Sequence, residues 1–96
     1  MRLELSSRAD ADLVAILEYG AEHFGWNRAE AYTEGFGESF ALLTEYPEIG
    51  SLHEDFRPPI RSLPYGSHRI FYDIVGDTIC VQRILHKAMD AQRWLV

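Results

Sequence analysis

The stretch that decides the fold spans residues 68–86 and reads HRIFYDIVGDTICVQRILH. Two segments, 68–74 and 78–85, alternate along their length and are rich in β-branched and aromatic residues, which is typical of strands. Gly76 and Asp77 lie between them, and glycine paired with aspartate favours a tight turn. The stretch therefore predicts an antiparallel hairpin in which Val75 lies opposite Thr78.

This pairing assigns each hairpin side chain to one face, because alternate residues of a strand point in opposite directions. One face is apolar and is expected to cover helices: Ile70, Tyr72, Ile74, Ile79 and Val81. The opposite face mixes apolar, polar and charged residues: Arg69, Phe71, Asp73, Cys80, Gln82, Ile84 and His86. We interpret the mixed face as a candidate binding surface.

Upstream of the hairpin, residues 60–63 keep the same alternation and predict a further strand, followed by a turn at 64–66. Residues 47–59, PEIGSLHEDFRPP, have no sustained period and contain three prolines. We expect them to form an irregular connection.

The amino-terminal half predicts a short strand and then two helices. Leu3 and Leu5 alternate with charged residues, which indicates a strand. Ser7 and Asp10 have the spacing of a capping box, so a helix is expected from Ser7 to Gly25. Its buried stripe is predicted to be Ala9, Leu13, Ile16, Leu17, Gly20 and Phe24.

A second helix is expected to begin at a similar capping signal at Asn27 and to end before Pro47, folding back on the first helix. Gly35 inside it suggests close packing against the first helix, whereas Gly37 has no explanation in the sequence. The buried stripe is predicted to be Ala31, Tyr32, Gly35, Phe36, Phe40, Leu43 and Tyr46.

These elements predict an α+β fold of order β-α-α-β-β-β, with a helical hairpin packed on an antiparallel sheet. A short carboxyl-terminal helix capped by Asp90 follows. With 96 residues the chain is expected to form one domain, residues 1–96. No apolar run approaches the roughly 20 residues of a membrane span, and charge begins at Arg2, so we expect a cytoplasmic protein.

The charges are distributed unevenly along the chain. Residues 1–56 hold three basic and twelve acidic side chains, whereas residues 57–96 hold six basic and three acidic ones. The formal net charge of −6 argues against direct DNA binding. The basic residues of the carboxyl-terminal part remain candidates for binding carboxylates or phosphates.

Known catalytic and metal-binding spacings are absent from the sequence. It has one cysteine, Cys80, and no HExxH, EF-hand, GxSxG or phosphate-loop motif, so we expect no metal and no cofactor. A basic set remains: Arg61, Arg69, Arg83, His86, Lys87 and Arg93. Such groups could neutralise phosphate and transfer protons during RNA cleavage. The alternative is structural, with Arg69 paired to Asp73 and His86 an ordinary residue at a strand end.

The sequences RIFY (69–72) and RILH (83–86), followed by Met89 and Asp90, resemble the signature of the RelE/ParE superfamily of type II toxin–antitoxin modules. The resemblance covers nearly the whole chain and includes the segment YPEIG (46–50). It implies a toxin that a cognate ParD-like antitoxin binds and inactivates in a hetero-oligomeric complex.

Two targets are known for such toxins. RelE-like members cleave mRNA on the ribosome, and the residues here for that chemistry would be Arg69, Arg83, His86 and Lys87. ParE-like members inhibit DNA gyrase and have no established nuclease centre. This chain has a single lysine, no tyrosine after Tyr72 and an acidic balance, and all three departures favour the ParE-like target.

The resemblance and the mixed sheet face together give two candidate surfaces. We expect the antitoxin to bind at Arg61, Arg69, Phe71, Gln82 and Ile84. We expect the target to bind at His86, Lys87, Asp90, Arg93 and Trp94.

Overall fold

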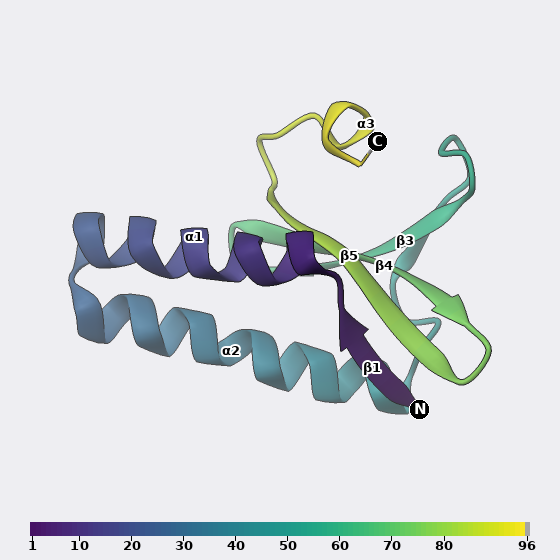
Figure 1. Ribbon diagram of the computed structural model, residues 1–96, viewed down its shortest axis with the longest axis horizontal. Coiled ribbons are helices and arrows are strands. Elements are labelled where there is room, and N and C mark those ends of the chain that lie inside the picture. The colour runs from purple at the N-terminus through teal and green to yellow at the C-terminus, as the bar shows by residue number, and fades with distance from the viewer. Residues whose placement is uncertain (96) are drawn as a thin grey trace.

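Two long antiparallel helices pack on one face of a five-stranded sheet in the computed structural model, which describes residues 1–95 (Figure 1). None of the described helices is both long and apolar enough to cross a membrane. The elements in chain order are β1 (Arg2–Leu5), α1 (Ser7–Phe24), α2 (Trp26–Glu45), β2 (Ser51–His53), β3 (Ile60–Tyr65), β4 (His68–Val75), β5 (Thr78–His86) and α3 (Ala91–Trp94).

The predicted α+β class and the helical hairpin are confirmed, but the sheet is mixed rather than antiparallel. Its strand order is β1-β5-β4-β3-β2, and β1 lies parallel to β5, with Arg2 opposite Thr78 and Leu5 opposite Val81. The expected pairing of Val75 with Thr78 is present in the β4–β5 hairpin. The parallel pair joins segments more than 70 residues apart, so no local pattern could indicate it.

The connection after α2 is not wholly irregular, which corrects the sequence interpretation. Residues 51–53 form β2, which pairs antiparallel with β3, and Leu52 lies opposite Arg61. A strand of three residues is too short to show a period. The β3 strand also continues through Pro64 to Tyr65, so that its turn falls at Gly66 and Ser67.

A β-bulge in β5 reverses the predicted faces beyond residue 81. Phe71 pairs with Arg83 and Tyr72 with Val81, which leaves Gln82 as an extra residue in β5. Ile84 therefore joins the core beneath the helices instead of lying on the opposite face with Phe71.

The helix starts also differ from the predicted ones. Ser6, not Ser7, caps α1, and its Oγ accepts a hydrogen bond from the Ala9 amide at 3.0 Å. The same hydroxyl donates to the Gln82 carbonyl at 2.7 Å, which joins the start of α1 to β5. Gly25, with φ at +88°, ends α1 as predicted and also precedes α2, so the predicted capping box at Asn27 does not form.

The principal core lies between the helices and the sheet. It is built from fully or nearly buried residues of every layer: Ala9, Phe36, Leu43, Ile70, Tyr72, Ile79, Val81 and Ile84. Three residues assigned to the buried helix stripes are exposed instead: Phe24, Ala31 and Tyr46. Gly35 packs against the ring of Tyr65 on β3, not against α1, whereas Gly20 is the glycine that lets the helices approach, at Ala29.

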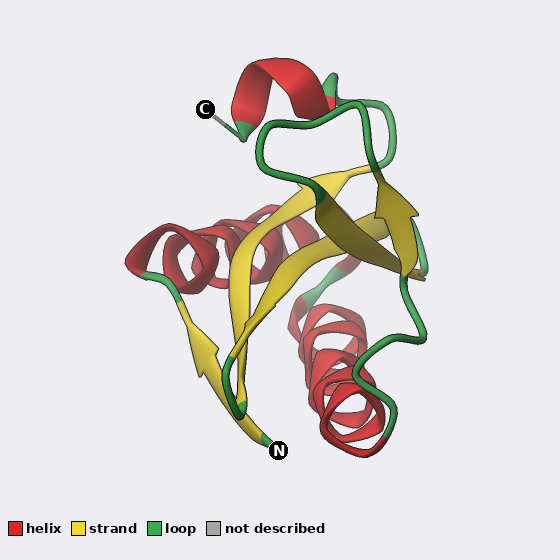
Figure 2. Cartoon of the chain, turned by 90° about the vertical axis from the view of Figure 1, so that its right-hand side faces the viewer, coloured by secondary structure: helices red, strands yellow, loops and turns green. Residues whose placement is uncertain are grey.

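A second, smaller core covers the other face of the sheet. Ile60, Phe71, Leu85 and Ala91 are buried there, and Phe56, Met89 and Leu95 pack against them. Figure 2 shows the long helices on one side of the curved sheet and α3 near its other side. The mixed face of the hairpin is therefore largely covered by the chain itself.

Candidate binding groove between the helical hairpin and the sheet

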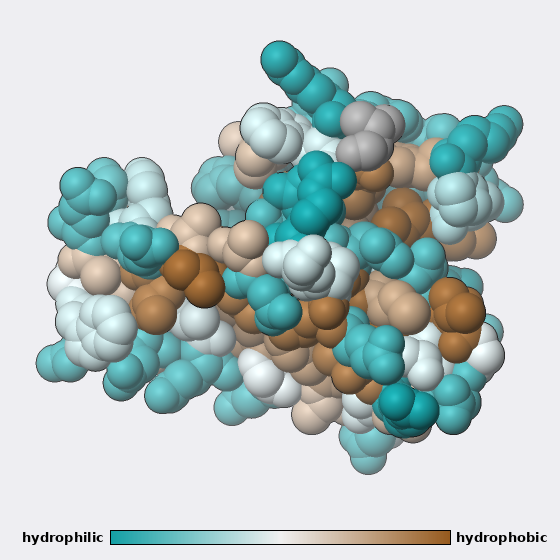
Figure 3. Space-filling view, viewed as in Figure 1, coloured by the Kyte–Doolittle hydropathy of each residue, from teal (hydrophilic) through white to brown (hydrophobic). Residues whose placement is uncertain are grey.

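An open cavity of about 700 Å³ lies between the helical hairpin, the adjoining ends of β4 and β5, and the segment that leads to α3. We call it the hairpin groove. Figure 3 shows exposed apolar residues over the helical hairpin. Its lining residues include Ala15, Ile16, Tyr19, Gly20, Phe24, Ala29, Ile84 and Met89, together with the polar residues Asp12, Arg28, Tyr32, Ser67, His68 and His86.

Small residues and exposed aromatic rings shape the apolar part of the hairpin groove. A Cβ on Gly20 would lie 3.0 Å from the Cβ of Ala29, so the helices approach closely there. Tyr19 and Phe24, at the far end of α1, keep 60% and 59% of their surface exposed. Because these two exposed rings adjoin the apolar lining of the groove, this end of the groove is a candidate contact surface.

The polar wall of the hairpin groove centres on Tyr32. Its hydroxyl lies 2.6 Å from Nδ1 of His68 and accepts the Ser67 amide hydrogen at 3.0 Å. The imidazoles of His68 and His86, which face each other across β4 and β5, have centroids 5.3 Å apart. Burial, and then the neighbouring His86, lower the pKa of His68, while Asp12 acts in the opposite direction.

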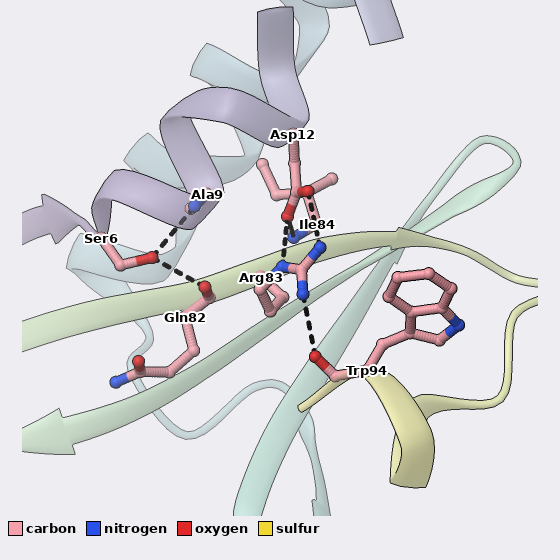
Figure 4. A network of polar contacts seen from close by, with 7 residues as sticks. All are labelled: Ser6, Ala9, Asp12, Gln82, Arg83, Ile84 and Trp94. Carbon is pink, nitrogen blue, oxygen red and sulfur yellow. Dashed lines mark hydrogen bonds and ion pairs between the residues drawn. The ribbon is translucent and has the colours of Figure 1, made fainter. Parts of the chain in front are cut away.

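Ion pairing within the chain determines which charged side chains of the hairpin groove remain available to a partner. The Asp12 carboxylate is held by Arg83, whose Nε and Nη2 donate to it at 2.8 and 2.9 Å (Figure 4). Arg28 lies over the ring of Phe24 at 5.8 Å and makes no ion pair within residues 1–95. The groove therefore offers a cation and two imidazoles beside an apolar floor.

Arg83 joins three elements and is not free for chemistry. Besides the two bonds to Asp12, its Nη1 donates to the Trp94 carbonyl of α3 at 2.8 Å. Asp12 also accepts the Ile84 amide hydrogen at 2.9 Å. The hydrogen bond with Asp12 raises the pKa of Arg83, so the guanidinium stays charged.

Burial contradicts two of the residues predicted to bind the antitoxin. Phe71 is fully buried in the second core, and the bulge directs Ile84, 3% exposed, into the principal core. Arg61 donates to the Gly50 carbonyl at 2.8 Å and anchors the chain before β2. Gln82 donates to Asp73 at 3.2 Å.

Arg69 does not pair with Asp73, which corrects the structural alternative considered for it. Its guanidinium lies 5.0 Å from the centroid of Phe71, and its Nη2 donates to the Met89 carbonyl at 3.4 Å. Its Nε is buried without a hydrogen-bond partner among residues 1–95. Arg69 thus lies on the sheet face opposite the hairpin groove.

The residues predicted to bind the target follow one another at the end of the chain. Asp90 caps α3 as expected, because its side chain accepts the Gln92 amide hydrogen at 3.2 Å. His86 accepts the Ala88 amide hydrogen at Nδ1. Lys87, Arg93 and Trp94 are exposed, Trp94 by 41%. All five residues belong to residues 86–95, which we call the C-terminal segment.

The structure separates three of the four candidate nuclease residues. His86 faces the helices, Arg69 lies on the other face of the sheet, and Arg83 is engaged by Asp12 and Trp94. Among the described residues, no three histidine, cysteine or acidic side chains are grouped to hold a metal ion.

The hairpin groove itself was missed by the sequence interpretation. Ile16, Gly20 and Phe24 had been assigned to a buried stripe, and an apolar helix face looks the same in sequence whether it meets the core or an open groove. The sequence signal that could have indicated it is the cluster of aromatic residues around the interhelical turn: Tyr19, Phe24 and Trp26.

Comparison with known proteins assigns the family. Residues 3–91 match the family model described as the ParE toxin of the type II toxin–antitoxin system, parDE. The chain is 36% identical over 93 residues to Toxin ParE1 of Mycobacterium tuberculosis (strain ATCC 25618 / H37Rv), covering 96% of this chain and 95% of that one. It is 34% identical over 91 residues to Toxin ParE1 of Caulobacter vibrioides, covering 95% and 94%.

A solved structure described as the chromosomal ParDE TA system from P. aeruginosa has the same fold. The TM-score is 0.79 at 23% identity, and the match covers 90% of this chain and 95% of the other. The resemblance noted in the strand motifs is thus confirmed over nearly the whole chain. This chain belongs to the ParE toxin family of type II toxin–antitoxin systems.

Proposed function

We propose that this toxin inhibits DNA gyrase and that its cognate antitoxin neutralises it by inserting an amphipathic segment into the hairpin groove. The free toxin would act in the cytoplasm, and the neutralised toxin would be held there in a toxin–antitoxin hetero-oligomer. Membership of the ParE family supports the antitoxin partner. The lining of the hairpin groove is the basis for placing the antitoxin there.

The observation that carries this proposal is the composition of the hairpin groove. Its volume of about 700 Å³ and its long side along α1 suit one face of a helix, which is a common way to recognise a peptide. Arg28 and the two imidazoles lie around the apolar floor, so a segment with apolar and acidic residues is complementary in charge. This placement replaces the sheet face that the sequence suggested.

A single variant in the hairpin groove tests this part of the proposal. Ala15 lines the groove and is exposed, so Ala15→Arg fills the groove without disturbing the core. We expect it to weaken antitoxin binding by about tenfold or more, because a bulky charge would displace apolar contacts. Val14 is 56% exposed on the same helix and does not line the groove, so Val14→Arg is the matched control.

The antitoxin for this titration is the product of the neighbouring gene, and circular dichroism establishes that each variant is folded. Wild-type affinity for a folded Ala15→Arg protein would contradict the assignment of the groove. Loss of binding in Val14→Arg as well would show that the contact surface lies elsewhere on α1.

Two observations support gyrase rather than mRNA as the target. The candidate nuclease residues Arg69, Arg83 and His86 are dispersed, so these three do not assemble a group that binds phosphate and transfers a proton. The C-terminal segment instead presents Lys87, Arg93 and the partly exposed Trp94 without a catalytic arrangement. Such a surface suits binding to another protein.

A further inference from the structure

We propose that antitoxin binding in the hairpin groove is linked to proton uptake by the His68–His86 pair, so that the complex tightens as the pH falls from 8 to 6. This inference rests on the proposed function, since it concerns the same groove. The proposed function names the antitoxin as the occupant of the groove, and this inference adds that its affinity depends on pH.

The geometry places two titratable rings where an acidic partner would meet them. His68 and His86 both line the hairpin groove, and their ring centroids are 5.3 Å apart. His86 is exposed and His68 is half-buried, so the pair connects the groove wall with solvent. Histidine is the side chain whose ordinary pKa, about 6.5, lies in this pH range.

The hydrogen bonds around Tyr32 can accommodate either charge state of His68. When Nδ1 of His68 is unprotonated, the Tyr32 hydroxyl can donate to it across 2.6 Å. When Nδ1 carries a proton, it can donate to the Tyr32 oxygen, and the hydroxyl can turn to the Tyr65 carbonyl at 3.4 Å. The Ser67 amide donates to the same oxygen at 3.0 Å in the observed arrangement. Charging the His68 ring therefore leaves both its Nδ1 and the Tyr32 hydroxyl with a hydrogen-bond partner.

The groups that face His68 act on its pKa in opposite directions, and the balance in the free toxin lowers it. Burial lowers its pKa first, and the His86 ring on β5 lowers it further. Asp12 on α1 raises it but is shared with Arg83, while the Tyr32 hydroxyl on α2 lies 2.6 Å from Nδ1. Arg28 also lines the groove, so a protonated ring would share the groove with this second cation.

An acidic segment in the hairpin groove would instead raise the pKa of His68. Carboxylates within a few ångströms of the rings favour the imidazolium form, because opposite charges attract strongly where water is excluded. A group whose pKa rises on binding takes up a proton, and by linkage the affinity then increases as the pH falls. The occupant implied by this chemistry is an antitoxin segment that places acidic residues beside His68 and His86.

Calorimetric titration of the toxin with its antitoxin at pH 6.0 and pH 8.0 tests the proposal. For each ring whose pKa rises by one unit on binding, the affinity increases by at most a factor of about ten, and the full factor is reached only below the pKa of the free ring. We expect the dissociation constant to be about tenfold lower at pH 6.0. The titration is then repeated in two buffers of different ionisation enthalpy. The difference between the two binding enthalpies should correspond to net proton uptake by the complex.

The doubly substituted protein His68→Gln/His86→Gln should bind with less than about a twofold difference between the two pH values. His53 lies 2.6 Å from Ser62 Oγ and does not line the groove, so His53→Gln is the control and should keep the tenfold change. In the wild-type complex, the imidazole resonance of His68 should titrate at a higher pH than in the free toxin. This last measurement requires no substitution.

Equal affinity at both pH values in the wild-type complex would overturn the proton linkage while leaving the groove assignment intact. An unchanged pH dependence in the folded double variant would also overturn it, because other groups would then be responsible. Absence of binding at either pH would contradict the antitoxin partnership itself.

Discussion

Asp12 on α1 and Arg83 on β5 form a two-point ion pair, with N···O distances of 2.8 and 2.9 Å. Their side chains are only 14% and 11% exposed, and the remaining Arg83 donor holds the Trp94 carbonyl of α3. The pair therefore fixes the helical hairpin and the C-terminal segment to the same strand. The end of this strand lines the groove proposed for the antitoxin and leads into the C-terminal segment proposed for the target.

Arg83→Met should destabilise the fold considerably, because the largely buried Asp12 carboxylate would lose two hydrogen bonds and the charge that balances its own. Removing one partner of a buried pair costs about 3 kcal/mol, and we expect a loss of that order in the free energy of unfolding measured with urea. Arg2 and Glu4, 71% and 61% exposed, form a surface pair for comparison. Arg2→Met should change stability by less than about 0.5 kcal/mol, and equal losses in both variants would show that burial of the Asp12–Arg83 pair has no special importance.

Tyr72→Phe removes a hydroxyl that connects β4 to the chain after α2. The hydroxyl accepts the Gly50 amide hydrogen at 2.9 Å and donates to the Pro47 carbonyl at 2.7 Å. Removing it leaves both backbone groups without this partner, at a cost of about 1–3 kcal/mol in unfolding free energy. Tyr46 is 59% exposed, so Tyr46→Phe should be neutral. A neutral Tyr72→Phe would mean that the two backbone groups find other partners.

Gly35 and Gly37 lie two residues apart on α2 and should respond oppositely to alanine. A Cβ at Gly37 meets nothing within 4 Å, so Gly37→Ala should stabilise the protein by about 0.5–1 kcal/mol through helix propensity. A Cβ at Gly35 would collide with the Tyr65 ring, so Gly35→Ala should destabilise it by about 1–3 kcal/mol. Thermal unfolding of both variants checks the sign, and a stabilising Gly35→Ala would contradict the close packing on β3.

The free toxin should lose stability below neutral pH in a way that depends on His68. Burial and His86 lower the folded-state pKa of His68, so the unfolded chain binds a proton more readily than the folded chain. Its contribution is therefore present above the unfolded pKa of about 6.5 and is lost as the pH falls below it. Urea unfolding of wild type and His68→Gln at pH 7.5 and 5.5 should show the larger acid loss in wild type. The same loss in both proteins would exclude His68 as its source.

Much of this fold could be predicted from the sequence because its signals are local. The period-two hairpin around Gly76, the helical spacing of α1 and α2, and the stop at Pro47 each depend on a few neighbouring residues. The parallel β1–β5 pair, the three-residue β2 and the bulge at Gln82 depend on contacts between distant segments. The extra residue at the bulge shifts the register by one residue and places Ile84 on the face opposite to the predicted one.

The candidate site was less predictable than the fold. Arg69 and His86 were singled out together by residue type, yet they lie on opposite faces of the sheet. The residues around Tyr32 come from α2 and from both ends of the β3–β4 turn. Their meeting follows from packing the hairpin on the sheet, which residue spacing does not specify.

Trp94→Ala tests the C-terminal segment as the target surface. Its indole is 41% exposed at the end of α3, and partly exposed tryptophan is a frequent anchor in protein interfaces. We expect about tenfold more toxin to be needed for half-inhibition of gyrase, with unchanged antitoxin affinity. Trp26 is 54% exposed at the interhelical turn, and Trp26→Ala should inhibit like wild type. Full potency of folded Trp94→Ala would remove this residue from the target surface.

The most direct test of the whole account is DNA supercoiling by purified gyrase in the presence of increasing amounts of the toxin, with and without its antitoxin. The account predicts dose-dependent loss of supercoiling, which wild-type antitoxin reverses and which it reverses poorly for the Ala15→Arg toxin. Unimpaired supercoiling by gyrase, in the presence of folded toxin that still arrests growth, would contradict the proposed target.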